Sequence, residues 1–541
     1  MKSAQGDKTY TSPVRKLARF FEKSRNQWKA KCRVAKAKAK RLANRVHFLE
    51  GSRAHWKKRV KELEAELADV KAARQALEQE INALRKTLAE TAIRPCAPEA
   101  FRQISPHHQY SIGHILLFVS LVLSAAASLR GAGSAMAILL AMLQLSPTSP
   151  SWSAGRLWLL RLGYYKLTRP KVHAEDWVWI LDHTVQLGAE KCLLILGVRL
   201  SALPPVGQCL SHEDAEPIAL LPVTHSNGTV VFQQLEATVE TTGVPREIIS
   251  DQGSDLRSGV EKFCQVHVET SSVYDIKHKT AAVLKHELEH DETWREFTQQ
   301  AAQTRSRLQQ TALAPLMPPS LRTQARYMNV DLLIEWGRHL LTYLDDQGHL
   351  GDPSADTPNA FDSKQVEEKL GWLREFRQPM GEWAELLQIV TTTETLVRQE
   401  GLSPGVHLKL EGRLPPRAST ERAGRIRAGL LTFVAQEEAK ARPNERLLGS
   451  SEVIESVFGK LKRLERDQAK SGFTGLILGV CAIVSTTTQE VVQRALEAAP
   501  TKQVLAWCKK NLGSSVQSRR RAFFTILDRT EQKPDRLWGP A

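Results

Sequence analysis

The sequence lacks the features of a secreted or zinc-stapled protein. Its seven cysteines are odd in number, lie far apart and include no CxxC pair. This pattern excludes a readable disulfide framework and a zinc ribbon. The first residues, MKSAQGDKTY, are polar and do not form a secretory signal. We therefore expect a reduced, intracellular chain.

Long apolar runs are also scarce. One stretch, SIGHILLFVSLVLSAAASL from Ser111 to Leu129, approaches the roughly 20 residues that a membrane span needs. It contains His114 and is rich in Ala and Ser, and Arg130 and Gly131 separate it from a second apolar run. We expect a buried helix pair here and no membrane partner. A membrane-anchored protein is the alternative.

Acidic residues are nearly missing from one N-terminal segment. Between Arg15 and Arg45 there are thirteen Lys and Arg residues and one acid, Glu22, and the whole chain carries a net charge of +16. Such a surface attracts polyanions, so nucleic acid or an anionic membrane is the expected partner. The 541 residues suffice for several folded domains.

Heptad spacing follows the basic segment. Apolar residues occupy the two core positions, at Val60, Leu67, Ile81 and Leu88 and at Leu63, Val70, Leu77 and Leu84. Glu and Lys flank this seam, which Arg74 interrupts and Pro95 ends, as in a coiled coil. We expect residues 1–95 to form a basic helix and a coiled coil that joins copies of the chain in a homodimer or higher oligomer. A solvated charged helix without a partner is the alternative.

Residues 96–170 have the pattern of a compact helical region. In LSPTSPSWSAGRLWLLRLGYYKL a proline-rich turn precedes an apolar-periodic helix, and Ser151 or Ser153 is placed to cap it. Arg156 and Arg161 are expected on the exposed side of that helix. Together with the preceding helix they predict a helix-turn-helix that binds DNA. An ordinary pair of packed helices is the alternative.

After Arg169 the period changes from that of helices to that of strands. The segments 177–188 and 191–203 are rich in Val, Ile, Leu and Trp and are predicted to pair as a hairpin, with a third strand at 217–225. We then expect a helix, a short strand, a helix, a strand and a helix. The first helix falls at 230–243. The short strand and the start of the second helix fall within 246–256. The last strand falls at 269–279, and the last helix follows it.

Two aspartates fall at the ends of predicted strands. Asp182 follows the apolar run WVWIL, and Asp251 follows EIIS. Ligands gather at strand ends in open α/β sheets, and an ionised carboxylate there needs a positive partner. Two such carboxylates side by side suit divalent cations that prefer oxygen ligands. A third carboxylate from a helix would complete a cage for two metals, the arrangement used in phosphoryl transfer.

The strand order, with Asp182 on the first strand and Asp251 after the fourth, resembles the RNase H-like core of DDE/D transposases. In that family the last acid lies on a helix and is often followed seven residues later by Lys or Arg. Glu455 and Lys462, in SSEVIESVFGKLK, have this spacing, which places both on one helix face. The resemblance implies that Glu455 is the third metal ligand and that Lys462 binds a DNA phosphate. Glu452 is the competing third acid.

The long interval between Asp251 and Glu455 is similar to the hAT-like arrangement, in which a helical insertion precedes the last acid. Asp275 and His278 resemble the C/D-x-x-H motif of those groups, so His278 is expected to contact DNA, with a structural role as the alternative. Tryptophans in the insertion are expected to be core anchors. For Trp294 the alternative is that its ring stacks on an unpaired base of the transposon end.

The resulting prediction is a multidomain α plus α/β chain. Its domains are a basic helix and coiled coil (1–95), a helical DNA-binding region (96–170), a first part of an RNase H-like core (171–286), an α-helical insertion (287–448), and the rest of the core with a helical tail (449–541). The resemblance implies a bacterial, cytoplasmic and nucleoid-associated transposase that uses two Mg²⁺ ions, or Mn²⁺ in their place. Its partner is double-stranded DNA, as transposon terminal repeats and target. A transposase-derived regulator without catalysis and a nuclease of the same fold are the alternatives.

Overall fold

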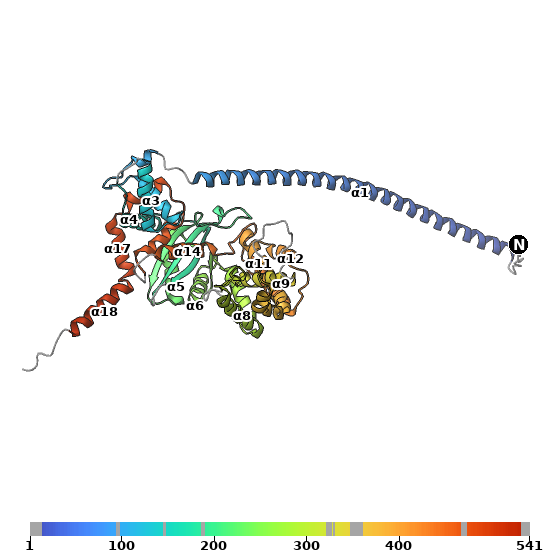
Figure 1. Cartoon of the computed structure of the whole chain (residues 1–541). Helices are drawn as coiled ribbons and strands as arrows, with labels where there is room; N and C mark the ends of the chain where they lie inside the picture. Colours follow the sequence, from blue (N-terminus) through green and yellow to red (C-terminus); the bar gives the residue numbers. More distant parts are fainter. Residues whose placement is uncertain are drawn as a thin grey trace, which may run out of the picture. The chain divides into compact units, whose positions relative to one another are not determined.

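The computed structural model describes residues 13–92, 98–143, 148–185, 190–320, 327, 330–346, 361–466 and 473–531. The chain forms two compact units, Met1–Pro95 and Cys96–Ala541. The first contains one helix, α1 (Val14–Ala92), as the heptad pattern predicts (Figure 1). All thirteen basic side chains between Arg15 and Arg45 are exposed on it. Val60, the first residue of the heptad pattern, is exposed too. The other heptad side chains, from Leu63 to Leu88, are not among those that the structure describes, so the coiled coil stays a prediction.

The second unit contains a five-stranded mixed sheet with the order β3-β2-β1-β4-β5. The strands are β1 (Trp177–Val185), β2 (Lys191–Arg199), β3 (Glu216–Val223), β4 (Glu247–Ser250) and β5 (Ser271–Tyr274). β1, β2 and β3 pair antiparallel, whereas β4 runs parallel to β1 and β5 parallel to β4. The predicted hairpin, third strand and two crossover strands are all confirmed.

Both faces of the sheet are covered, which explains why β1 and β2 read as continuous apolar runs. Trp179 and Leu181 pack in one core with α5 (Gly228–Thr242) and α6 (Ser254–Val266). The alternate residues of β1, Val178 and Ile180, belong to a second core that includes α14 (Glu452–Arg466). Figure 1 shows α5 and α6 on one side of the sheet and α14 on the other.

The two apolar runs near residues 120 and 140 form two helices, as expected. They are α2 (Ile112–Leu123) and α3 (Leu129–Met142), and α4 (Trp152–Thr168) follows with Ser151 as its N-cap. Only α2 is mostly buried, since α3 buries Ala132, Met136 and Leu140 alone. Across the described ranges, no helix is long and apolar enough to cross a membrane. α4 packs against α15 (Gly479–Ile483) and α16 (Gln489–Ala498), so this region shares a core with the C-terminal part of the chain.

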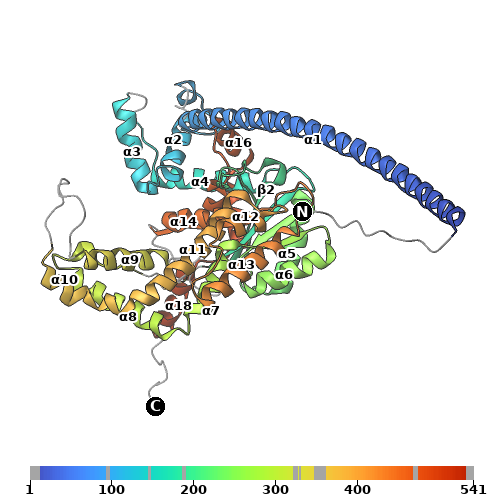
Figure 2. The ribbon, with the colours of Figure 1, turned by 90° about the vertical axis from the view of Figure 1, so that its right-hand side faces the viewer.

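Between the sheet and α14 the described chain is helical, as predicted. The helices are α7 (Ile276–Leu288), α8 (Glu292–Leu308), α9 (Asp331–Asp345), α10 (Ser363–Leu370), α11 (Arg377–Glu400), α12 (Val406–Arg413) and α13 (Glu421–Glu438). Figure 2 shows α8, α9 and α10 gathered in one helical group. After α16 the chain ends with α17 (Thr501–Leu512) and α18 (Val516–Glu531).

Trp294 lies inside this helical group, and its position corrects the stacking prediction. Its side chain is 1% exposed, and its ring centroid is 4.9 Å from that of Trp383 in an edge-to-face arrangement. Phe297 packs against both tryptophans. An indole enclosed on all sides has no face for a DNA base, so Trp294 is a core anchor.

Candidate active site

Strand register brings the predicted aspartates side by side. Leu181 of β1 is paired with Ser250 of β4 in parallel, and the next residues along the two strands are Asp182 and Asp251. Ser250 is in turn paired with Tyr274 of β5. Because parallel strands end at the same sheet edge, the two aspartates lie together at that edge. β1 continues to Val185, so Asp182 lies within the strand and not at its end.

Asp182 points toward the face of the sheet that α14 covers. Side chains alternate along a strand, so Asp182 shares a face with Val178 and Ile180. Its Oδ1 accepts a hydrogen bond of 2.6 Å from the backbone N–H of His183. Burial, and then the charge of Asp251, raise the pKa of Asp182 to about 7, and Glu455 acts in the same direction. Three acids thus share one electrostatic field, and added positive charge would relieve their repulsion.

A tight turn orients Asp251. The next residue, Gln252, has a left-handed backbone with φ of 56°. The N–H of Gly253 then donates to Asp251 Oδ1 at 2.9 Å, before α6 begins at Ser254. A Cβ on Gly253 would lie 3.4 Å from Asp251 Oδ1 and 3.6 Å from Asp255 Oδ1. Glycine here therefore leaves space between two carboxylates.

Asp255 is an acid that sequence reasoning missed. Burial alone would raise its pKa, but hydrogen bonds from Ser226 and Lys191 and the charge of His183 lower it to about 2. Lys191 Nζ lies 3.0 Å from Asp255 Oδ2. The DQGSD spacing around Gly253 is the signal that could have found it. Since its charge is already neutralised by Lys191, Asp255 is an anchor of the turn and not an open ligand.

Glu455 lies on α14 and faces α7. Its Oε1 is 3.1 Å from His278 Nε2, and Lys277 Nζ is 3.8 Å from its Oε2. The His278 hydrogen bond lowers the pKa of Glu455 against the effect of burial, and Lys277 and Lys462 lower it further. Lys462 is exposed two turns along the same helix. Glu455 and Lys462 therefore lie near each other along α14, as their spacing predicts.

His278 contacts a carboxylate in this structure, whereas the sequence pattern assigns it to DNA. Burial would lower its pKa, but the hydrogen bond with Glu455 and the charges of Asp275 and Asp251 raise it. The imidazole therefore carries a proton more readily than a free histidine does, and it holds the Glu455 side chain in place. These contacts fit the alternative interpretation, in which His278 has a structural role instead of contacting DNA.

The structure separates the two candidates for the third acid. Glu452 Oε2 lies 2.5 Å from Arg398 of α11, and Lys277 is 4.0 Å from its Oε1. Glu452 thus joins α14 to the helical insertion. Glu455 is the one whose charge raises the pKa of Asp182. Glu455 is therefore the better third acid, as expected from the spacing.

Asp275 ties the two halves of the site together. It is 1% exposed and caps α7, where its Oδ1 accepts from the N–H of His278 at 2.8 Å. Its Oδ2 accepts from the N–H of Ser451 at 2.5 Å and from the Ser451 hydroxyl at 2.9 Å. Ser451 directly precedes α14, so one carboxylate fixes the start of the helix that carries Glu455. The Asp-x-x-His spacing thus has an observed structural role.

The three acids suit a divalent cation by their chemistry. Carboxylate oxygens are the ligands that Mg²⁺ and Mn²⁺ prefer, and burial, followed by the charges of Asp251 and Glu455, raises the pKa of Asp182. Among the residues that the structure describes, no three His, Cys, Asp or Glu side chains converge closely enough to hold a metal ion. The Glu455 carboxylate is turned toward His278 and Lys277 instead. To share an ion, the carboxylates of Asp182, Asp251 and Glu455 would have to rotate toward one another.

No protein-family model matches this chain, and no curated protein has a matching sequence. A function for the chain therefore rests on its own residues and their geometry.

Arg161 is buried, which corrects the expectation that it faces DNA. Its guanidinium donates to the carbonyls of Ala499 (2.7 Å) and Leu496 and lies 2.7 Å from His108 Nε2. These contacts satisfy the C-terminal carbonyls of α16. Arg156 is half-buried, and burial lowers its pKa. The sequence gives no sign of the contacts with Ala499 and Leu496, because these residues lie more than 300 positions from Arg161.

Replacing Arg161 with Gln is expected to lower the free energy of unfolding by about 2–3 kcal/mol, because buried carbonyls lose a charged donor. Urea denaturation of the purified protein measures this loss. Arg156→Gln is the matched control and should cost less, since the side chain is half-buried. If Arg161→Gln leaves stability unchanged and instead weakens DNA binding, the original prediction was right.

Proposed function

We propose that this chain is a DNA transposase of the DDE type, which cuts and joins DNA strands at the ends of a mobile element. The observation that carries the proposal is that Asp182 and Asp251 lie side by side at one edge of the sheet, with Glu455 on α14 near enough that burial, the charge of Asp251 and that of Glu455 raise the pKa of Asp182. The strand order β3-β2-β1-β4-β5, with a helical segment between β5 and α14, supports the RNase H-like core with an insertion.

In this proposal the three carboxylates hold two Mg²⁺ ions, with Mn²⁺ able to replace them. Such ions, when bound, activate a water or 3′-hydroxyl and stabilise the leaving oxygen in phosphoryl transfer. Asp275 positions α14, and His278 holds Glu455 until its carboxylate turns to the ions. Lys462 is exposed on the same helix and would bind a phosphate of the DNA strand.

The substrate in this proposal is double-stranded DNA, as terminal repeats and as target. The exposed basic half of α1 supplies a surface for DNA phosphates, and the following heptads would join protomers in a homo-oligomer. α3 and α4 supply the proposed helix-turn-helix, with Arg156 in place of the buried Arg161 as its remaining basic contact. A protein acting on chromosomal DNA would be cytoplasmic and nucleoid-associated in a bacterium.

The decisive experiment compares Glu455→Gln with Glu452→Gln. Both substitutions remove one charge from the same helix, three residues apart, yet only Glu455 acts on Asp182. We expect Glu455→Gln to reduce Mg²⁺-dependent nicking by at least about 100-fold, because a carboxylate of the metal site is lost. Glu452→Gln should retain most activity. The substrate is a plasmid that carries the DNA flanking the protein's own gene.

The assay also separates the rival functions. Cleavage followed by strand joining supports a transposase, and cleavage without joining indicates a nuclease. Specific binding of the flanking DNA without Mg²⁺-dependent nicking indicates a transposase-derived regulator. Equal activity in Glu455→Gln and the wild type would refute the proposed site.

A further inference from the structure

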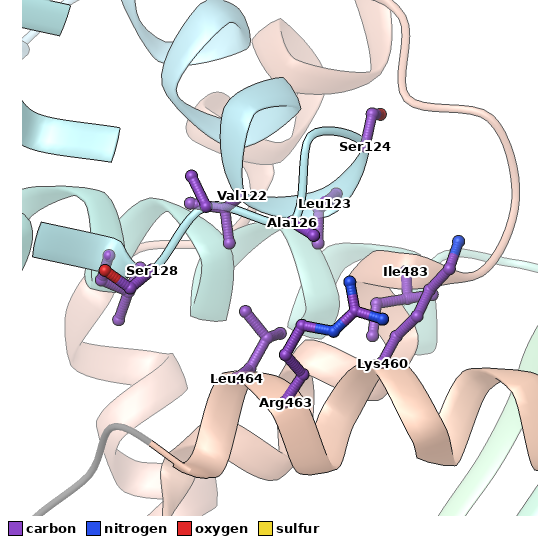
Figure 3. A pocket seen from close by; sticks show the side chains of 11 residues that line it. Val122, Leu123, Ser124, Ala126, Ser128, Lys460, Arg463, Leu464 and Ile483 are labelled. Atoms are coloured by element: carbon purple, nitrogen blue, oxygen red, sulfur yellow. The ribbon is translucent and has the colours of Figure 1, made fainter. Parts of the chain in front are cut away.

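A basic cavity lies on α14 away from the three acids. Its volume is about 70 Å³, and Lys460, Arg463 and Leu464 of α14 form one wall. The other wall consists of residues 122–129, which end α2 and begin α3, together with Ile483. Figure 3 shows both side chains rising from α14, that of Arg463 toward the turn at Ala126 and that of Lys460 past Ile483. Among the described residues that line it, none is Asp or Glu.

Lys460 has an unusual partner for a cation. Its Nζ lies 2.8 Å from His212 Nε2, and the N–H of Ser485 donates to the carbonyl of His212 at 2.8 Å. Burial and then the charge of Lys460 lower the pKa of His212, so the imidazole is neutral and accepts from the ammonium. An ammonium has three N–H donors, and this contact uses one. As an ammonium, Lys460 would therefore have donors left for a ligand.

Arg463 stands beside Lys460 without a partner among the described residues. The two are three positions apart on α14, so their side chains are neighbours on the helix surface. Burial lowers the pKa of Lys460, the charge of Glu213 raises it, and the charge of Arg463 lowers it. Among the described residues no carboxylate lines the cavity itself, so an anion there would be stabilised by both cations.

The opposite wall is suited to the same ligand. Ser128 caps α3, where its Oγ accepts from the N–H of Gly131 at 3.0 Å, and its hydroxyl can still donate outward. α3 has 14 residues, so the N-terminal end of its dipole adds a favourable field for negative charge. The cavity exceeds the roughly 30 Å³ share of one water molecule, so it has room for more than one water-sized group.

We propose that this cavity binds a phosphate group of the DNA backbone. The inference rests on the proposed function for the identity of the polyanion, and it adds a second contact to that of Lys462. Arg463 follows Glu455 by eight residues on one rigid helix, about 12 Å along its axis. A phosphate held here therefore fixes the path of a DNA strand a few nucleotides from the acids.

The first test measures DNA binding by the full-length protein in EDTA as salt is raised. Each phosphate contact contributes about 0.9 to the slope of log affinity against log salt for duplex DNA. Lys460→Gln/Arg463→Gln is expected to lower this slope by about one and the low-salt affinity about tenfold. Arg466→Gln is the matched control, because Arg466 is exposed on the same helix and does not line the cavity. An unchanged slope in the double variant overturns the proposal.

The second test uses inorganic phosphate as the probe. At equal ionic strength phosphate should raise the melting temperature of the wild type more than chloride does, because a ligand that binds the folded state stabilises it. The increment should vanish in the double variant and in Arg463→Gln alone, which removes no observed internal contact. An equal increment in these variants refutes the site. If phosphate stabilises the wild type alone but the DNA slope does not change, the ligand is a free phosphate and the DNA assignment is wrong.

The proposed function and the proposed phosphate site can be refuted independently of each other. The binding tests contain no metal, so they do not depend on cleavage. A protein that nicks DNA through its acids but shows no change in slope keeps the proposed function and loses this phosphate site. A protein whose slope falls in the double variant but which never nicks DNA keeps the phosphate site as part of a DNA-binding regulator.

Discussion

Replacement of Asp182 with asparagine is expected to abolish DNA nicking and, at the same time, to stabilise the folded protein. The amide has the size of the carboxylate but carries no charge to share with a divalent cation. Removal of one charged group from a phosphoryl-transfer site costs at least about 100-fold in rate. DNA binding should stay near the wild-type level, because Asp182 is directed at the acids and not at a basic surface.

The stability gain follows from the raised pKa. Asp182 titrates at about 7 in the fold and at about 3.8 when unfolded, so the folded state binds its proton more tightly. The penalty for ionising it therefore grows as pH rises from about 4 and is complete above about pH 7. At about 1.4 kcal/mol per pH unit, Asp182→Asn should gain about 2–4 kcal/mol at pH 8 and much less at pH 5.

Urea denaturation in EDTA at these two pH values measures the difference. Glu452→Gln is the control, because its carboxylate is paired with Arg398 and its removal should not stabilise the chain. A variant that loses both activity and stability at pH 8 would indicate that Asp182 supports the fold and has no role in chemistry. An inactive but more stable variant is the signature of a functional site, where repulsion between acids is retained at a cost in stability.

The sequence was sufficient to predict the elements that carry the acids. Runs such as WVWILD and EIIS are short, apolar and bounded by turn residues, and their burial in a covered sheet makes them readable as strands. The choice of Glu455 over Glu452 came from its seven-residue spacing to Lys462 on one helix face. That choice agrees with the contacts of Arg398, which occupy Glu452.

Burial and long-range contacts could not be predicted in the same way. Arg161 reads as an exposed arginine on an amphipathic helix, and only the packing of α16 against α4 encloses it. Trp294 reads as a site for a base, until α11 brings Trp383 against it. The Asp275-x-x-His278 spacing resembles a family motif, but the hydrogen bond between Asp275 and Ser451 spans 176 positions. Such contacts depend on how distant segments pack, which local patterns do not specify.

Lys166 leads to the second large effect that we expect. It is 0% exposed on α4, and its Nζ lies within hydrogen-bonding distance of four oxygens of α15 and the segment that follows it. These are the carbonyls of Ala482 (3.1 Å), Val484 (2.8 Å) and Ser485 (2.7 Å) and Oγ1 of Thr487 (2.9 Å). Lys166→Met fills similar space but leaves these acceptors without a donor. Because a broken buried charge contact costs several kcal/mol, we expect a loss of about 3–5 kcal/mol by urea denaturation.

The pH dependence of that loss tests its cause. Burial, and then the charge of Arg169, lower the pKa of Lys166 from 10.5 to about 7, so the unfolded chain binds this proton more tightly than the folded one. The penalty for the charged form is complete below about pH 7 and fades as pH rises toward 10.5, so Lys166 adds stability over that range. Lys166→Met lacks this gain, and the gap between variant and wild type should widen from pH 7 to pH 9. Lys262→Met, which removes an exposed contact to one hydroxyl, should show a small and constant loss. A gap that stays constant from pH 7 to pH 9 would mean that the ammonium form, held by its carbonyl acceptors, persists in the fold well above pH 7.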